Sequence, residues 1–147
     1  MDLGVYNPLS ELMIKDGYQV DNTEVGVDLD LDMSVVQGKN YDVITAFEIF
    51  EHMLAPFNIL RETTADFLVA SVPLKLWFAN AYWNEEVEWD RHYHEFEPRQ
   101  FDMLLGRTGW KIIDSHKWAV KSNKIGVRPI LRRTTPRYYL VVCERVK

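Results

Sequence analysis

Apolar runs alternate along the chain with segments that carry helical spacing and helix-boundary residues. Strands are predicted for residues 2–4, 24–30, 41–47, 66–73, 110–118 and 137–146, and helices for residues 7–17, 57–64 and 97–109. Strands that are apolar throughout and alternate with helices are typical of a parallel sheet covered on both faces. The pattern therefore predicts an α/β fold with a doubly wound, mostly parallel sheet.

Local signals mark where the predicted elements begin and end. Asn7 suits the N-cap position of a helix, with Pro8 at the first helical position, and Gly17 follows the last turn. Pro98 likewise lies in the first turn of the helix predicted for residues 97–109. These residues fix the expected helix ends more firmly than the apolar spacing does.

Residues 74–96 interrupt the alternation with aromatic side chains that follow no clean periodicity. We expect a long, partly helical excursion over the sheet. Its aromatic side chains either roof a pocket for an aromatic or glycosyl acceptor or pack the excursion itself. The residues concerned are Trp77, Tyr82, Trp83 and Trp89.

Composition fits one domain of residues 1–147. The hydrophobic fraction of 47% is enough for a compact core, and no repeat or low-complexity linker divides the chain. No apolar run approaches the ~20 residues that cross a bilayer, and no basic region followed by an apolar stretch opens the chain. We therefore expect a cytoplasmic protein without a membrane span. Its one cysteine, Cys143, is expected to be a buried structural thiol.

The net charge of −5 is unevenly distributed. Residues 117–147 hold nine Lys or Arg and one acid, whereas residues 1–116 hold eight Lys or Arg and 21 acids. Such a basic tail either meets an anionic partner or folds back on the acidic body, and its strand-forming residues favour the second. Nucleic acid is disfavoured because basic and aromatic residues are not interleaved in the tail. A phosphate on a nucleotide-linked or lipid-linked substrate would contact Arg128, Arg132, Arg133 or Arg137.

Residues 46–52, with the sequence AFEIFEH, place three polar side chains where the apolar strand of residues 41–47 ends. Glu48, Glu51 and His52 are spaced i, i+3 and i+4, so they share one face of a helix that begins there. This face would present three ligands to one divalent ion. Acids early in a helix are also favoured by its dipole, so the same residues are compatible with a site that holds no metal.

In this order the segments resemble the landmarks of a class I S-adenosylmethionine-dependent methyltransferase of the small-molecule branch, similar to methyltransferase types 11 and 23. The matching pieces are DLG, GVDLD, YDVITAFEIFEH, LVASVP and RHYHEFEPRQFDMLLGRTGWKII. The resemblance implies a Rossmann-like, seven-stranded sheet whose final hairpin, near residues 110–116 and 138–145, is reversed. It also implies ligands beyond the carboxyl ends of the strands, where the strand order reverses.

The resemblance assigns cofactor contacts to two places. In the family, the loop after the first strand wraps the methionine part of S-adenosylmethionine, and an acid ending the second strand binds the ribose hydroxyls. Asp28 takes the place of that acid, because an ionised carboxylate accepts both hydroxyl hydrogen bonds; the alternative is a solvated carboxylate. The other residues expected to contact the cofactor are Asp2, Gly4, Tyr6 and Phe47.

The first loop departs from the family pattern Asp-x-Gly-x-Gly-x-Gly. Asp2 and Gly4 are kept, but Tyr6 and Pro8 stand where later glycines would let the backbone approach a ligand closely. Tyr6 either fills the methionine pocket or stacks beside the cofactor. Because residues 28–41 form a short span, we expect a reduced second and third strand. The chain also starts inside the first strand, as expected of a trimmed N-terminus.

The Glu-x-x-Glu-His pattern resembles that of ubiquinone-pathway O-methyltransferases and small-RNA 2′-O-methyltransferases, in which it binds a metal near the acceptor hydroxyl. The resemblance implies a divalent metal such as Mg²⁺ at Glu48, Glu51 and His52, which would lower the pKa of that hydroxyl. His52 and His94 are the candidate catalytic residues; His94 is alternatively a fourth ligand or a structural residue. Residues expected to meet the small-molecule substrate are Glu48, Trp83 and His92.

Two functions are consistent with these features. The first is methyl transfer from S-adenosylmethionine to oxygen, nitrogen or carbon of a small molecule. The second is a non-catalytic relative that kept the sheet but lost the cofactor loop. A dinucleotide-binding oxidoreductase is disfavoured because no Gly-x-Gly-x-x-Gly follows the first strand.

Overall fold

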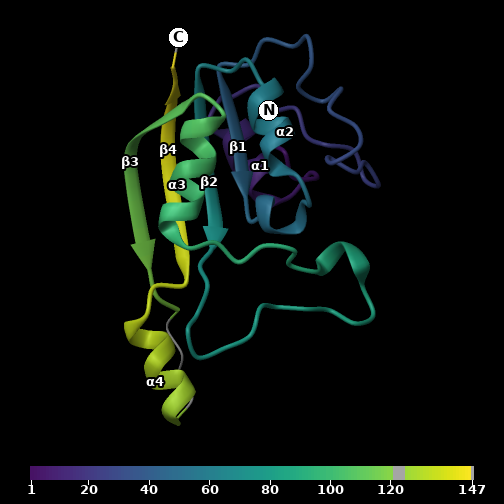
Figure 1. Ribbon diagram of the computed structural model, residues 1–147. Helices are drawn as coiled ribbons and strands as arrows, with labels where there is room; N and C mark the ends of the chain where they lie inside the picture. Colours follow the sequence, from purple (N-terminus) through teal and green to yellow (C-terminus); the bar gives the residue numbers. More distant parts are fainter. Residues whose placement is uncertain (121–124, 147) are drawn as a thin grey trace.

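The computed structural model of the protein describes residues 1–120 and 125–146; residues 121–124 and Lys147 of the basic tail lie outside the described part. Figure 1 shows the arrangement of the elements. In chain order they are α1 (Pro8–Lys15), β1 (Val43–Phe47), the 3-10 turn η1 (Phe50–His52), α2 (Pro56–Glu62), β2 (Phe67–Pro73), the 3-10 turn η2 (Glu88–Asp90), α3 (Pro98–Arg107), β3 (Trp110–Trp118), α4 (Val127–Thr134) and β4 (Tyr138–Arg145).

The sheet has four strands in the order β1-β2-β4-β3. β1 and β2 run parallel, and β4 runs antiparallel to both β2 and β3. Beyond β1, Asp2 forms parallel bridges with Thr45 on one side and Asn22 on the other. An α/β fold with a reduced second and third strand and an antiparallel final strand is therefore confirmed. The sheet of the described residues is mixed, however, and has four strands instead of the seven that the resemblance implies.

Residues 24–30 form turns instead of the predicted strand. Gly26 takes a left-handed backbone conformation with φ +89°, and the Asp28 carboxylate accepts a hydrogen bond from the Asp30 amide at 2.9 Å. The Asp28 carbonyl also accepts the amide of Asp32 at 2.8 Å. Glycine tolerates positive φ, and a short carboxylate bonds nearby amides. This turn chemistry outweighs the two valines of the segment, and the strand prediction was wrong.

The helix boundaries follow the local signals of the sequence. The Asn7 side chain caps α1 by accepting the amides of Leu9 at 2.8 Å and Ser10 at 3.3 Å, and Pro8 occupies the first turn. Such a cap stabilises a helix by about 1 kcal/mol. Pro98 opens α3 in the same way. Both helices begin at the predicted residues because these interactions involve only neighbours in the chain.

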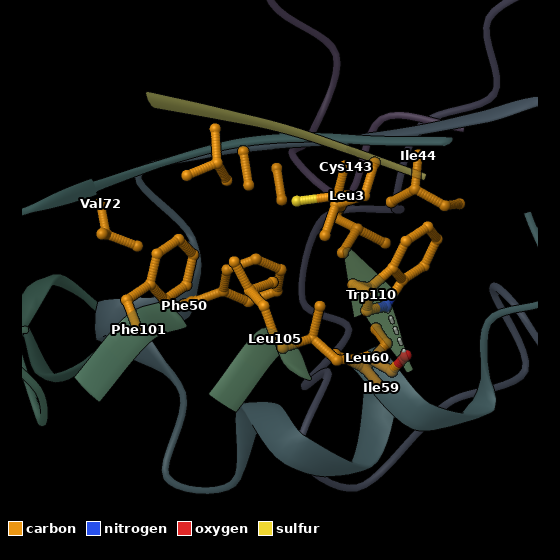
Figure 2. Packing of buried hydrophobic residues seen from close by; sticks show 14 of the residues in the cluster. Leu3, Ile44, Phe50, Ile59, Leu60, Val72, Phe101, Leu105, Trp110 and Cys143 are labelled. Atoms are coloured by element: carbon orange, nitrogen blue, oxygen red, sulfur yellow. Dashed lines mark hydrogen bonds between the residues drawn. The ribbon is translucent and has the colours of Figure 1, made fainter. Parts of the chain in front are cut away.

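The core lies between the sheet and helices α2 and α3, which cover the same face (Figures 1 and 2). Trp110 is almost completely buried, and its Nε1 donates to the Leu60 carbonyl at 3.0 Å. β1 buries only alternate residues, so the prediction of a strand buried on both faces was wrong for this segment. Cys143 is buried as predicted, and burial raises the pKa of its thiol to about 12. Among the described residues, no helix has the length and apolar character that crossing a membrane requires.

Candidate functional site

The site forms where β1 and β2 end. The two strands are parallel, so their carboxyl ends lie at the same edge of the sheet, which is where open α/β sheets bind ligands. Figure 1 shows the excursion of residues 74–96 extending beyond this edge. The chain leaves β1 through Glu48 into η1, and it leaves β2 at Pro73 into the excursion.

Glu48 does not begin a helix, so the predicted shared helix face for Glu48, Glu51 and His52 was wrong. Glu48 has a left-handed backbone conformation, φ +54°, which is rare for residues other than glycine. Two contacts with Ser71 of β2 hold it: the Glu48 amide donates to the Ser71 carbonyl at 3.0 Å, and the Ser71 hydroxyl donates to Glu48 Oε1 at 2.7 Å. Burial raises the pKa of the Glu48 carboxyl.

Glu51 is completely buried, at 0% exposed. Neither of its carboxylate oxygens has a hydrogen-bond partner among the described residues. Burial raises the pKa of Glu51 to about 8, and the nearby Glu48 charge acts in the same direction. A buried carboxylate without partners is unfavourable, so such groups mark sites where a proton, an ion or a ligand completes the structure.

His52 is oriented by a backbone contact. Its Nδ1 lies 3.0 Å from the carbonyl oxygen of Arg91. A carbonyl oxygen only accepts, so Nδ1 carries the proton and Nε2 of the neutral ring is left as an acceptor. That Nε2 lies 3.9 Å from Glu51 Oε1.

His92 completes a group of three side chains. Its ring meets the His52 ring edge-on, with 4.8 Å between the ring centroids, and its Nδ1 is buried with no hydrogen-bond partner in the described part of the chain. Burial lowers the pKa of His92 to about 4, so the ring is neutral near neutral pH. Ligand atoms of Glu51, His52 and His92 all lie within 4.8 Å of one another.

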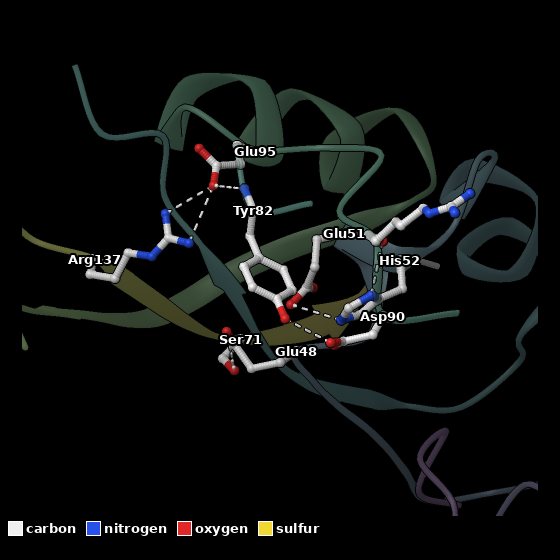
Figure 3. A network of polar contacts seen from close by, with 9 residues as sticks. Glu48, Glu51, His52, Ser71, Tyr82, Asp90, Glu95 and Arg137 are labelled. Atoms are coloured by element: carbon white, nitrogen blue, oxygen red, sulfur yellow. Dashed lines mark hydrogen bonds and ion pairs between the residues drawn. The ribbon is translucent and has the colours of Figure 1, made fainter. Parts of the chain in front are cut away.

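These side chains face a cavity of about 280 Å³. It brings together four of the residues predicted to act in catalysis or to bind substrate or metal, namely Glu48, Glu51, His52 and His92, and Figure 3 shows most of its polar side chains. The lining residues are Glu48, Glu51, His52, Pro73, Tyr82, His92, Arg137 and Tyr138. His94 is not among them; its Nε2 lies 3.3 Å from the Leu54 carbonyl oxygen, and its ring packs 5.5 Å from that of Phe96.

Arg137 and Tyr82 also line this cavity; the sequence suggested Arg137 as a phosphate contact and Tyr82 as a wall of an acceptor pocket, but placed neither beside Glu51 and His52. Both guanidinium Nη atoms of Arg137 lie 3.2 Å from Glu95 Oε1, and the same oxygen accepts the Tyr82 amide at 3.2 Å. The Tyr82 hydroxyl donates to Asp90 at 2.8 Å (Figure 3). These contacts tie the basic tail to the acidic excursion, as the charge distribution favoured. Only the opposite charges of the two segments signalled this contact in the sequence.

A second cavity, of about 560 Å³, adjoins the first, and both are lined by Tyr82, Arg137 and Tyr138. It lies between the excursion and α4. Trp83, predicted to meet the substrate, lines this second cavity and not the first. The first loop, where the cofactor was expected, lies at the other side of β1.

Asp2 is buried at the start of that loop, and its carboxylate is surrounded by donors. Thr45 Oγ1 donates to it at 2.9 Å and the Asn22 amide group at 3.1 Å. The Gly4 amide and Ser10 Oγ contribute further bonds at 3.4 Å. Tyr6, by contrast, is 59% exposed and fills no pocket.

Asp28 does not end a strand, which was the basis for placing it at the ribose. It is exposed and belongs to the turn described above. The segment that pairs with Asp2 is centred on Asn22, and the Thr23 amide donates to the Gly4 carbonyl at 3.2 Å. The acid just beyond this pairing is Glu24, which is exposed. The sequence did not point to Glu24, because the apolar residues that follow it favoured a later strand.

No family model and no curated protein matches the sequence. Solved structures do match. A Burkholderia thailandensis 1,6-didemethyltoxoflavin-N1-methyltransferase, solved with 1,6-didemethyltoxoflavin and S-adenosylhomocysteine, aligns with a TM-score of 0.60 at 18% identity over 97% of this chain and 59% of that one. An S-adenosylmethionine-dependent methyltransferase from Mesorhizobium loti aligns with a TM-score of 0.56 at 16% identity, covering 93% and 77%.

The same fold also carries another activity. The [4+2]-cyclase SpnF aligns with a TM-score of 0.54 at 14% identity over 93% of this chain and 61% of that one. At these identities the likeness is one of fold, and the chain spans 59% of the length of the Burkholderia enzyme. From its strand order, its antiparallel final strand and these matches, the chain has the fold of the class I S-adenosylmethionine-dependent methyltransferases.

Proposed function

We propose that the chain binds S-adenosylmethionine beside β1 and the Asp2 segment that bridges to it, and transfers its methyl group to a small-molecule acceptor in the 280 Å³ cavity. One observation carries this proposal: the cavity lies beyond the carboxyl ends of β1 and β2 and contains, next to two imidazoles, a buried carboxyl group with no hydrogen-bond partner among the described residues. Solved relatives of the fold include methyltransferases, one of them with S-adenosylhomocysteine bound.

The cofactor would contact the edge formed by the first loop and β1. We assign the contacts there to Gly4 of the first loop and to Phe47, which ends β1. We assign the ribose contact to Glu24 in place of Asp28, because Glu24 follows the residues that pair with the Asp2 strand. An exposed carboxylate at that position accepts two hydroxyl hydrogen bonds without losing an existing partner.

Proton removal from the acceptor is assigned to His52. Its Nδ1 proton is held by the Arg91 carbonyl, so Nε2 in the cavity is free to accept the acceptor's proton as the methyl group is transferred. His94 is held at the Leu54 carbonyl outside the lining of this cavity, and we assign it a structural role. Holding acceptor and methyl donor in line supplies most of the rate enhancement in reactions of this kind.

As an alternative to acting as a base, His52 would join Glu51 and His92 in binding a divalent cation, because its Nε2 can take only one of the two roles. The two carboxylate oxygens of Glu51 and Nδ1 of His92 are buried without hydrogen-bond partners among the described residues, as unfilled ligands would be. Two imidazoles and one carboxylate suit Mn²⁺, Fe²⁺ or Zn²⁺ better than Mg²⁺, which prefers oxygen ligands. A bound cation would polarise the acceptor hydroxyl. The predicted trio thus changes, with His92 replacing Glu48.

The non-catalytic alternative rests on a specific observation. The carboxylate of Asp2 is saturated by hydrogen bonds from the chain itself, so the first loop is held closed on its own residues. Tyr6 and Pro8 also replace glycines that would bring the backbone close to a ligand. A domain of this kind would keep the acceptor cavity but bind no S-adenosylmethionine.

Calorimetric titration with S-adenosylhomocysteine separates the two functions. We expect micromolar binding that weakens at least about tenfold in Glu24→Gln, because a charge-assisted hydrogen bond contributes about 1.5 to 3 kcal/mol. Asp28→Asn is the matched control and should bind like the wild type. A chain that melts cooperatively yet shows no heat of binding would exclude cofactor binding and leave the non-catalytic domain.

A further inference from the structure

The larger cavity is a candidate anion site that the methyl-transfer proposal does not use. It has a volume of about 560 Å³ and is walled by residues 76–83 of the excursion on one side and by α4 and the residues around it on the other. Figure 1 shows the excursion and α4 beyond the same edge of the sheet. We propose that this cavity binds the phosphate or diphosphate group of a phosphorylated ligand, through Arg128 and Arg132.

The charges of the lining carry this inference. Three arginines line the cavity, and the described lining contains no acid. Arg137 is already neutralised by Glu95. Arg128 and Arg132 have no ion pair or hydrogen bond with any described residue. Within the described part of the chain, these two positive charges in the cavity are therefore uncompensated, and both belong to one face of α4 because they are four residues apart.

Two guanidinium groups that have no partner among the described residues and lie one helical turn apart match a dianion. A phosphate ester carries close to two negative charges at neutral pH and several strong acceptor oxygens. Each guanidinium offers a planar fork of donors that pairs with two such oxygens. A carboxylate would neutralise only one of the two charges. The charge of the cavity thus favours a phosphate ester or diphosphate over a carboxylic acid.

The rest of the lining fits an organic ligand that carries the phosphate. Tyr82, Trp83 and Tyr138 supply aromatic walls, and the volume lies within the range of small-molecule pockets, about 300 to 1,000 Å³. The Trp83 ring is held in place, because Arg91 lies 5.0 Å above it and the Tyr93 ring meets it edge-on at 6.2 Å. An aromatic wall with a fixed orientation favours a ring or an apolar chain over a bare inorganic ion.

The neighbouring cavity gives the ligand an orientation. Both cavities are lined by Tyr82, Arg137 and Tyr138, but the smaller one also contains Glu48, whose carboxylate repels an anionic group. A phosphorylated acceptor would place its phosphate between the aromatic walls and α4, and its neutral reacting group next to His52. This orientation rests on the proposed function, whereas the anion site itself does not.

The first test is a calorimetric titration of the chain with inorganic pyrophosphate. We expect saturable binding that weakens with added salt, as electrostatic binding does. Arg128→Gln and Arg132→Gln should each weaken it at least about fivefold, since a hydrogen bond to a charged group contributes at least about 1 kcal/mol. Arg133→Gln removes the same charge from the same helix outside the cavity lining, and should change affinity less than about twofold.

A second arm identifies the source of the phosphate. Flotation with phosphatidylcholine vesicles, with and without phosphatidic acid, tests a lipid headgroup. Binding to pyrophosphate or to phosphatidic acid that is lost in Arg128→Gln and Arg132→Gln, and kept in Arg133→Gln, supports the site. Absence of both kinds of binding, or equal losses in all three variants, overturns it. Arg128→Lys, which keeps the charge, should recover part of the affinity unless the loss came from unfolding of α4.

Titration with S-adenosylhomocysteine in parallel keeps the two proposals apart. Pyrophosphate binding without S-adenosylhomocysteine binding would reject methyl transfer and retain the anion site. The reverse result would reject the anion site alone.

Discussion

Arg137, just before β4, and Glu95, at the end of the excursion, form an ion pair at 3.2 Å in which the side chains are only 17% and 6% exposed. Arg137 Nη1 also donates to the Leu74 carbonyl at 2.7 Å, where the excursion begins. One guanidinium therefore holds both ends of the excursion against the sheet. Both ligand cavities depend on this arrangement, since Arg137 lines each of them.

Removing one partner of this ion pair should destabilise the protein strongly. Glu95→Gln leaves a largely buried guanidinium without its counter-charge, and breaking a buried pair costs about 3 to 5 kcal/mol. We expect a loss of about 3 kcal/mol in the free energy of unfolding, measured by urea denaturation. Glu88→Gln breaks the Glu88–Arg91 pair, in which the Glu88 side chain is 80% exposed, and should change stability by less than about 1 kcal/mol. Equal losses in the two variants would contradict this account.

Glu51 should make stability fall as pH rises. Its pKa is about 8 in the folded protein against 4.5 ordinarily. Below pH 4.5 the carboxyl is protonated in both states; between 4.5 and about 8 only the unfolded chain loses the proton, which favours unfolding. The expected slope is about 1.4 kcal/mol per pH unit. Denaturation in chelator should show this slope in the difference between wild type and Glu51→Gln. The difference isolates Glu51 from His92, whose lowered pKa acts in the opposite direction. A pH-independent difference would mean that Glu51 is not held protonated.

A divalent cation should restore part of the stability that is lost when the buried Glu51 carboxyl ionises. Binding to the folded state alone at a concentration 100 times the dissociation constant stabilises by about 2.7 kcal/mol. We expect Mn²⁺ or Zn²⁺ to raise the melting temperature more than Mg²⁺, and Glu51→Gln and His92→Gln to abolish the rise. His116→Gln, on β3 and outside the group, is the control. A rise that survives in both site variants would place the cation elsewhere.

Asp2 should contribute to stability whether or not a cofactor binds. In Asp2→Ala, Ser10, Asn22 and Thr45 lose a shared acceptor inside the protein. Buried donors left without partners cost about 1 to 3 kcal/mol each, and we expect a total loss of at least about 2 kcal/mol in denaturant unfolding. Asp16→Asn, an exposed change at the end of α1, should stay within about 0.5 kcal/mol of wild type. A stable Asp2→Ala protein would show that the network is not structural.

Local features of this chain could be predicted from sequence, and features set by distant pairing could not. Asn7 and Pro8 determine the start of α1 through neighbours in the chain, so that helix was predicted correctly. The strand predicted around Asp28 was wrong because its position depends on which residue pairs with Asp2, and that residue is Asn22. Turn chemistry near Asp28 then decided its conformation.

The sequence predicted which residues meet in the candidate site better than it predicted their arrangement. Glu48, Glu51 and His52 do meet one cavity, but the helix expected to unite them is replaced by the left-handed residue Glu48, which Ser71 of the neighbouring strand holds in place. His92 joins the group from 40 residues further along the chain. Periodicity reports local spacing alone, so it could not reveal this convergence.

Tyr82 lines both cavities, and its hydroxyl and amide are fixed by Asp90 and Glu95. A ligand that shifts this ring on one side changes the wall that a ligand on the other side meets. The two binding equilibria are then thermodynamically linked, and each occupant alters the affinity of the other by the same factor. Two separate ligands, one in each cavity, would therefore influence each other's binding through the position of Tyr82.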